Sequence, residues 1–200
     1  MKAFWGAIGL TLLLAGCGNG DGTPRVRVAV DAAPAITAPV EVEEILLPLT
    51  ADVDAKIAEI RDVLERNSMS RLVRLANSED SFVSNFAGEP HRVHWDLLRR
   101  TGFDPLMRLG TLLDGPYGTR QVGDQTWYIW PDFAALETED LVPARLDFAD
   151  RARLRELVGD VGLERIRNGE SYPGIRTAIA EDGRWLYFVH ETVQETEVSE

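Results

Sequence analysis

The chain has 200 residues, a formal net charge of −12 at pH 7 and a single cysteine. Its apolar fraction of 44% and aromatic fraction of 8% are typical of a folded globular protein. The negative charge excludes a nucleic-acid-binding role. One cysteine excludes an internal disulfide and a zinc site built from several thiolates.

The first 17 residues have the layout of a secretory signal. Met1-Lys2 is a short positive segment, residues 4–14 form an apolar run, and small residues precede Cys17. The apolar run is too short for a membrane-spanning helix, because a hydrocarbon core of ~30 Å needs about twenty residues. A plain cleaved signal leaves Cys17 unexplained, since the chain has no second cysteine to pair with it.

The run Leu14-Ala15-Gly16-Cys17 resembles the lipobox of bacterial lipoproteins. The resemblance implies that residues 1–16 are removed as a signal peptide, that the sulfur of Cys17 carries a diacylglycerol, and that its new amino group is acylated. Stable membrane attachment needs more than one acyl chain. The resemblance therefore implies a lipid-anchored protein of the cell envelope. Gly18 replaces the aspartate that often marks inner-membrane retention in that family, which favours the outer membrane with the domain facing the periplasm.

Residues 17–44 are expected to form the lipidated anchor and a flexible linker. Glycines and polar residues follow Cys17, and prolines separated by alanines occupy the later part. In residues 25–30, arginines and valines alternate. This segment is expected to be a solvated linker. Two alternatives are an edge strand and a segment whose arginines contact anionic headgroups.

Residues 45–191 are predicted to form one globular domain that begins with helices. Residues 50–77 carry apolar side chains at helical spacing, with a break at Asn67-Ser68. Two further helices are predicted, over residues 90–100 and from Asp104-Pro105 to Gly115, because proline is tolerated in a first helical turn and glycine commonly ends a helix. The positions expected to face the core in the first pair of helices are Val53, Ile57, Ile60, Leu64, Met69, Leu72, Val73 and Ala76.

Histidines are the most chemically suggestive residues of the chain. His91 and His94 lie three residues apart on one face of a predicted helix, a spacing from which two imidazoles can reach one divalent ion. His190 or Glu191 is the candidate third ligand. The established zinc motifs H-E-x-x-H and H-x-x-E-H are absent, and a first-turn histidine at 91 with a packed histidine at 94 is the structural alternative.

Residues 119–130 predict a hairpin, with a turn at Gly123-Asp124 and a second arm rich in strand-forming residues. Tyr128 and Trp130 share one face of that arm. Left exposed, these two rings are candidates for a platform that stacks on a sugar. Core packing is the alternative, because large aromatic side chains normally fill a small sheet.

The last third of the chain predicts an irregular acidic segment over residues 132–143, helices over 147–168 with a break at Gly159, and a closing hairpin. The turn of that hairpin is Asp182-Gly183. A two-residue turn pairs Ala180 with Trp185, and it places Leu186 and Phe188 on the core face, with Trp185 opposite. Residues 192–200 are expected to be a disordered acidic tail.

This order of elements predicts a single α+β domain, with a helical N-terminal half packed on a small antiparallel sheet of two hairpins. The stretches 127–132 and 182–189 resemble bacterial envelope proteins to which we attach no activity, so this resemblance implies no site. The sequence contains no nucleophile elbow, phosphate-binding loop or telling carboxylate pair.

The sequence therefore favours a non-catalytic domain, without a cofactor, that binds an envelope protein or glycan while the lipid holds it to the membrane. The alternative is a metal-dependent envelope hydrolase that uses His91 and His94. A structural spacer is the third interpretation.

Overall fold

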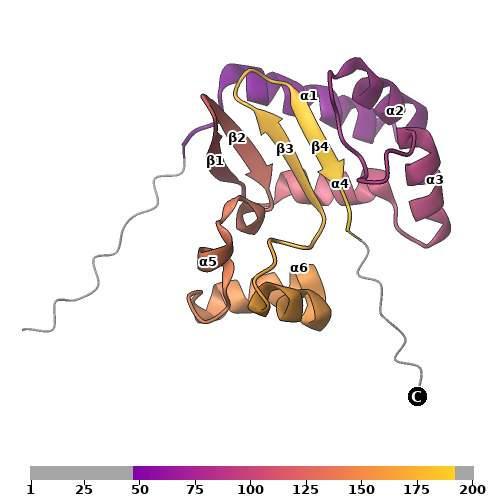
Figure 1. The fold of residues 1–200 in the computed structure, drawn as a ribbon. Helices are drawn as coiled ribbons and strands as arrows, with labels where there is room; N and C mark the ends of the chain where they lie inside the picture. Colours follow the sequence, from indigo (N-terminus) through magenta and orange to yellow (C-terminus); the bar gives the residue numbers. More distant parts are fainter. Residues whose placement is uncertain (1–46, 192–200) are drawn as a thin grey trace, which may run out of the picture. The chain divides into compact units, whose positions relative to one another are not determined.

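The computed structural model describes residues 47–191 (Figure 1). The signal peptide, Cys17, the linker and the acidic tail lie outside the described residues, so the expectations for them stay predictions. The domain from Leu47 onward is the subject of the geometry below.

Four helices come first, then a hairpin, further helices and a second hairpin, as the sequence predicts. Four side chains cap helix starts by accepting a backbone N–H: Thr50 from Val53, Ser68 from Arg71, Asp104 from Leu106 and Asp147 from Asp150. The elements are α1 (Ala51–Glu65), α2 (Met69–Ser78), α3 (His91–Arg100), α4 (Pro105–Asp114), β1 (Gly118–Val122), β2 (Gln125–Trp130), the 3₁₀ helix η1 (Asp132–Ala135), α5 (Thr138–Leu141), α6 (Phe148–Arg167), β3 (Arg176–Ala180) and β4 (Trp185–Val189).

The four strands form one antiparallel sheet in the order β1-β2-β3-β4 (Figure 1). The first hairpin is β1-β2 and the second is β3-β4, and β2 pairs with β3 to join them. Helices dominate the N-terminal half and the sheet lies in the C-terminal half. The predicted α+β class and the pairing of two hairpins are therefore confirmed.

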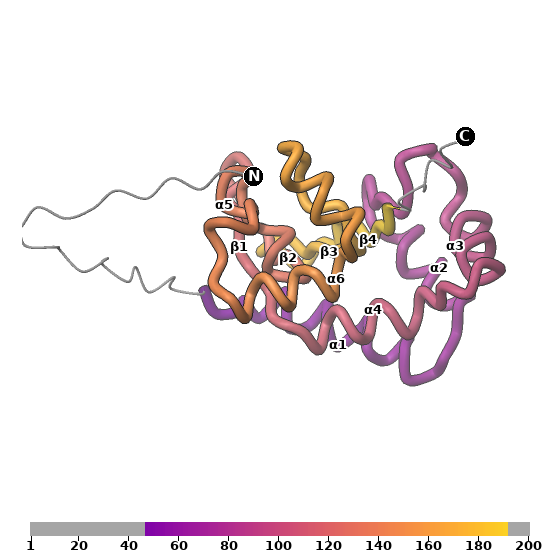
Figure 2. The backbone as a smooth tube through the Cα atoms, turned by 90° about the horizontal axis from the view of Figure 1, so that it is seen from below, coloured from indigo at the N-terminus to yellow at the C-terminus, as the bar shows by residue number. Residues whose placement is uncertain are grey.

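One face of the sheet packs on the N-terminal helices. Figure 2 shows α1 and α4 running along one side of the strands, with α5 on the other side. Trp95, Trp130 and Trp185 are among the largest fully buried side chains in this first core. The sheet contributes five buried residues to it, which are Tyr128, Trp130, Ile179, Trp185 and Phe188.

The opposite face of the sheet has a core of its own, closed by η1, α5 and α6. Ile129 and Ala178 supply the strand side of this second core. Leu141 of α5, Leu154 of α6 and Ile166 of α6 are each fully buried against them. Because both faces are covered, neighbouring residues of β2 and β3 are buried in opposite directions.

The predicted register of the second hairpin is wrong. Its turn has three residues, because the Ala180 N–H donates to the Arg184 carbonyl at 2.9 Å. A bulge then shifts the pairing between Ala178 and Ile179, so that Ile179 lies opposite Trp185 and Ala178 opposite Tyr187. The extra residue reverses the alternation of side chains, and Trp185 faces the first core while Leu186 packs against the second.

Two further details differ from the expectations or refine them. Residues 132–143, predicted to be irregular, contain η1 and the single turn of α5. The predicted break at Gly159 is confirmed, because this residue has φ 67° and ψ −177° between two helical segments. Among residues 47–191, no helix combines the length and the apolar character needed to cross a membrane.

The two hairpin turns provide a matched test of packing. Gly123 and Gly183 both have positive φ, 66° and 80°. A Cβ at Gly123 would meet no atom within 4 Å, whereas one at Gly183 would lie 2.9 Å from the Asp52 carbonyl oxygen of α1. We expect Gly123→Ala to cost ~1–2 kcal/mol through left-handed backbone strain. Gly183→Ala should cost at least ~1 kcal/mol more, because the turn must also move away from α1.

The measurement is urea unfolding of the chain from Gly18 to Glu200, followed by far-UV circular dichroism. Equal losses in the two variants would show that the hairpin turn does not pack tightly against the first turn of α1.

Candidate functional site

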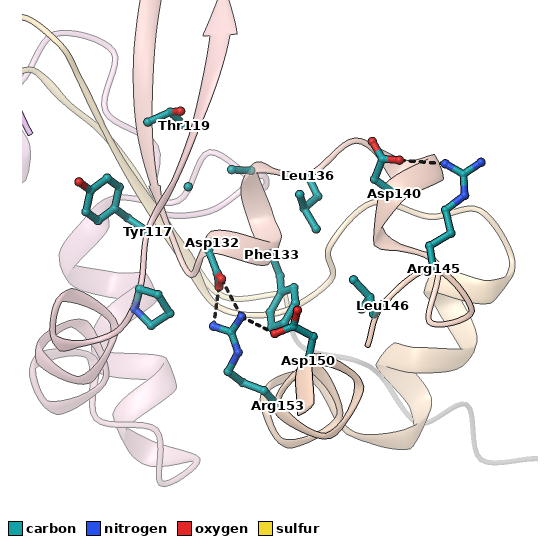
Figure 3. Close-up of a pocket in the computed structure, with 13 residues that line it drawn as sticks. Tyr117, Thr119, Asp132, Phe133, Leu136, Asp140, Arg145, Leu146, Asp150 and Arg153 are labelled. Carbon is teal, nitrogen blue, oxygen red and sulfur yellow. Dashed lines mark hydrogen bonds and ion pairs between the residues drawn. The ribbon is translucent and has the colours of Figure 1, made fainter. Parts of the chain in front are cut away.

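A cleft of about 510 Å³ lies beside the first strand, between η1, α5 and the start of α6 (Figure 3). Residues from five separate segments line it. They are Pro116, Tyr117, Gly118, Thr119, Asp132, Phe133, Ala135, Leu136, Asp140, Arg145, Leu146, Asp150 and Arg153. Its volume is within the ~300–1,000 Å³ that is usual for ligand sites.

Close backbone packing brings β1 and η1 together at one wall of the cleft. The Asp132 N–H donates to the Pro116 carbonyl at 3.0 Å. A Cβ at Gly118 would lie 2.6 Å from the Ala135 Cβ and 3.0 Å from the Asp132 carbonyl oxygen, so a larger residue at 118 would push the wall outward. On the same side, the Arg120 guanidinium donates to the carbonyls of Ala135 and Leu136.

Arg153 of α6 organises the middle of the cleft (Figure 3). Its two terminal nitrogens donate to the two carboxylate oxygens of Asp132 at 2.9 and 2.7 Å, and one of them also donates to Asp150 at 3.0 Å. Its Cζ lies 4.2 Å from the centre of the Phe133 ring, which is a cation–π geometry. Burial alone would lower the pKa of Arg153, but the hydrogen bonds that it donates to Asp132 and Asp150 outweigh burial and raise the pKa above its ordinary value.

A second ion pair lies at the rim, where Arg145 donates to Asp140 at 2.8 Å. Both side chains are 61% exposed, so they can exchange this contact for one with a ligand at little cost. The lining carries three aspartates and two arginines, and it includes no histidine, cysteine, serine or lysine. The cleft therefore presents charged hydrogen-bonding groups around an apolar floor of Leu136 and Leu146.

The predicted stacking platform is not accessible. Tyr128 is 3% exposed and Trp130 is 2% exposed, and both belong to the first core. The ring of Tyr117 covers them, with centroid distances of 5.9 and 5.4 Å, and the Tyr128 hydroxyl donates to the Pro48 carbonyl at 3.0 Å. The structural alternative of core packing describes these residues, and neither ring offers a face to a sugar.

His91, the first candidate metal ligand, is engaged by its neighbours. It lies in the first turn of α3, and its Nδ1 is 2.7 Å from the Ser84 hydroxyl. Its ring makes an edge contact with Phe82, with centroids 5.2 Å apart. This is the environment of a histidine that fixes the loop before α3.

The other two histidines lie near each other at the junction of α3 with the end of β4. The pKa of His190 is lowered by burial and further by the charges of His94 and Arg108. Its ring packs on Phe103 at a centroid distance of 4.3 Å. Among the described residues, His94 Nε2 and His190 Nδ1 are buried without a hydrogen-bond partner. Across residues 47–191, no group of three or more His, Cys, Asp or Glu side chains is arranged to hold a metal ion.

Sequence reasoning missed the cleft. Asp132 lies in a segment that the sequence predicts to be irregular, and Arg153 is one of five arginines of α6, where acidic residues are interleaved. The two residues are 21 positions apart and no local pattern links them, so their pairing follows only from the position of α6 beneath the sheet (Figure 1). An acidic residue directly after a strand is a weak signal that could have drawn attention to Asp132.

Comparisons with known proteins give no relative on which to place this site: no family model, no curated protein and no solved structure matches the chain.

The central ion pair should contribute measurably to stability. Asp132 and Arg153 are 26% and 35% exposed, so Arg153→Met leaves a partly buried carboxylate without its main partner. We expect a loss of ~1–2 kcal/mol in the free energy of unfolding. Arg145→Met, which breaks the exposed rim pair, should change it by no more than ~0.5 kcal/mol. Urea unfolding measures both, and equal effects would show that the central pair has no special structural role.

The histidines predict a pH dependence of stability. Burial lowers the pKa of His91, His94 and His190 in the folded state. Below the ordinary histidine value of ~6.5, the unfolded chain therefore binds more protons than the folded one. The stabilisation of the folded state that this difference provides is fully present above pH ~6.5, and it is lost as the pH falls below that value.

We expect the urea midpoint to be lower at pH 5.5 than at pH 7.5. The pKa values of the Asp62 and Asp182 carboxyls are also lowered, but these groups affect the stability only below about pH 4. The change between pH 5.5 and pH 7.5 is therefore assigned to the histidines. Replacing His94 and His190 together by glutamine should reduce the difference between the two midpoints. An undiminished difference in the double variant would assign the pH dependence to other groups.

Proposed function

We propose that this chain is a lipid-anchored protein of the cell envelope, on the periplasmic side of the outer membrane, whose domain binds a partner without catalysing a reaction. The observation that carries the binding role is the cleft between β1, η1 and α6, with its charged lining and apolar floor. The lipobox that ends at Cys17 supports the anchor.

The geometry favours a polypeptide partner over a glycan. Sugar sites commonly use an exposed aromatic face, but Phe133 is 2% exposed and Arg153 covers its ring. The cleft instead lies beside β1, an edge strand of the sheet. Edge strands accept extended peptides through backbone hydrogen bonds, and the two ion pairs can select charged side chains on such a segment.

A metal-dependent hydrolase has less support. It needs His91 and His94 to share an ion with a third ligand and with an open position for water. His91 Nδ1 is 2.7 Å from Ser84, and the described residues contain no group of three ligands. We therefore propose a binding role rather than a metal-dependent one.

The test begins with the anchored full chain in a bacterial host, carrying a photo-crosslinking amino acid at Leu146 in the cleft. The partner identified by mass spectrometry is then titrated against two charge-swapped variants. Asp140→Arg with Arg145→Asp reverses the rim pair, and we expect about tenfold weaker binding because a charged partner group meets the wrong sign. Asp62→Arg with Arg66→Asp is the control swap on α1, a similarly exposed pair at 2.7 Å.

Equal affinity in the two swapped variants, or no adduct from position 146, would contradict a binding role for the cleft. The mass of the purified protein reports the anchor independently. We expect a chain that starts at Cys17 and carries lipid, and an unmodified cysteine would refute the lipoprotein assignment.

A further inference from the structure

The outward face of α3 differs in charge from the rest of this acidic protein. The helix carries three arginines and one aspartate, which gives it a formal charge of +2 within a chain of −12. Arg99 and Arg100 are exposed in its last turn. The Asp96 carboxylate already forms an ion pair with Arg92, at a donor–acceptor distance of 2.6 Å.

Two arginines of this helix make no ion pair within the described residues, whereas Arg71 and Arg74 of α2 line a hollow together with Glu59 and Asp62 of α1. Within residues 47–191, the arginines that take part in no ion pair are Arg71 and Arg74 of α2, Arg99 and Arg100 of α3, Arg108 of α4 and Arg151 of α6. Five of these six lie on the consecutive helices α2, α3 and α4. The arginines of α6, by contrast, are mostly paired with nearby acids.

Apolar side chains are exposed on the same helix. Val93 is 48% exposed and Leu97 is 53% exposed, and their four-residue spacing puts them side by side on one face. Arg100 lies three residues after Leu97 and so shares this face. Leucine and valine next to an unpaired arginine are the composition of a surface that lies at the interface of an anionic bilayer, where the arginine stem and apolar groups enter the headgroup region.

We propose that this α3 face, formed by Val93, Leu97 and Arg100 and followed by the exposed Arg99 in the last turn, docks on an anionic phospholipid surface. The proposal rests on the anchor at Cys17 and adds an orientation to it. A few arginines alone bind such a surface weakly. An anchored domain needs only weak docking, because the anchor already holds it at high effective concentration beside the bilayer.

The chain between the anchor and the domain permits this orientation. Twenty-nine residues separate Cys17 from Leu47, and at ~3.3–3.6 Å each they span at most about 100 Å. A compact domain of this size is roughly 40 Å across. Both views place α3 at the opposite end of the domain from the residues that follow Leu47, and the span is long enough to allow α3 to reach the membrane (Figures 1 and 2).

The experiment uses the anchored full chain in vesicles. The sequence has no cysteine besides Cys17, so Leu97→Cys introduces one thiol for an environment-sensitive dye. Leu157→Cys, at a 37% exposed leucine of α6, is the matched control. Vesicles contain phosphatidylcholine with or without 30% phosphatidylglycerol, and a spin label on the lipid chains quenches a dye that touches the bilayer.

We expect the dye at position 97 to be quenched at least twofold more than the dye at 157 in vesicles with phosphatidylglycerol. High salt should remove the difference by screening, and so should Arg99→Glu with Arg100→Glu. The control for that charge reversal is Arg151→Glu with Arg167→Glu on α6.

Equal quenching at the two positions, or quenching at 97 that ignores phosphatidylglycerol and the Arg99/Arg100 reversal, would overturn the proposal. Circular dichroism checks that the exposed substitutions leave the fold intact. Mass spectrometry of the same sample reports the lipid on Cys17, so failure of the anchor and failure of the docking face are told apart.

Discussion

Burial of the sheet on both faces is the constraint on which the rest of the domain depends. Neighbouring residues of a strand point in opposite directions, so β2 and β3 must be apolar at almost every position, as the runs 127–130 and 178–180 are. Each face then needs its own helical cover, supplied by α1–α4 on one side and by η1, α5 and α6 on the other. Two polar side chains within the sheet are matched locally: the Trp185 indole donates to Thr177 at 2.8 Å, and Thr177 donates to the Tyr187 carbonyl at 2.7 Å.

The cleft exists because the second cover stops short of the sheet's edge. η1 packs so closely on β1 that only glycine fits at position 118, while α6 contacts η1 from below through the Asp132–Arg153 pair. The space between these contacts is bridged by ion pairs instead of apolar packing. The pair is only partly exposed, so it contributes to stability and also leaves charged groups accessible in the cleft. The same carboxylate and guanidinium groups can form charge-assisted hydrogen bonds with a charged partner segment.

The elements that were predictable from sequence are those set by local interactions. Such interactions act within a few positions of the chain. They are the helix caps at residues 50, 68, 104 and 147, the break at Gly159 and the turn glycines at 123 and 183. The bulge at Leu186 was not predictable, because it depends on a distant segment: the Val83 N–H donates to the Leu186 carbonyl at 3.1 Å. The cleft was not predictable for the same reason, since residues of five segments meet there. Tyr128 and Trp130 show a third limit, because alternation along a strand gives the face but not whether that face is covered.

The cleft and the α3 face lie on different elements, and this separation bears on the proposed attachment to a membrane. In both views, α5 beside the cleft and α3 are at opposite ends of the domain (Figures 1 and 2). A domain that rests on lipid through α3 therefore leaves the cleft and the edge of β1 facing away from the bilayer. Contact of the acidic remainder of the surface with anionic lipid would be repulsive, so the charge distribution itself selects this orientation. Under the proposed anchoring and docking, anchor, α3 and cleft would have complementary roles: the lipid would keep the domain at the surface, α3 would orient it, and the cleft would remain open to a partner.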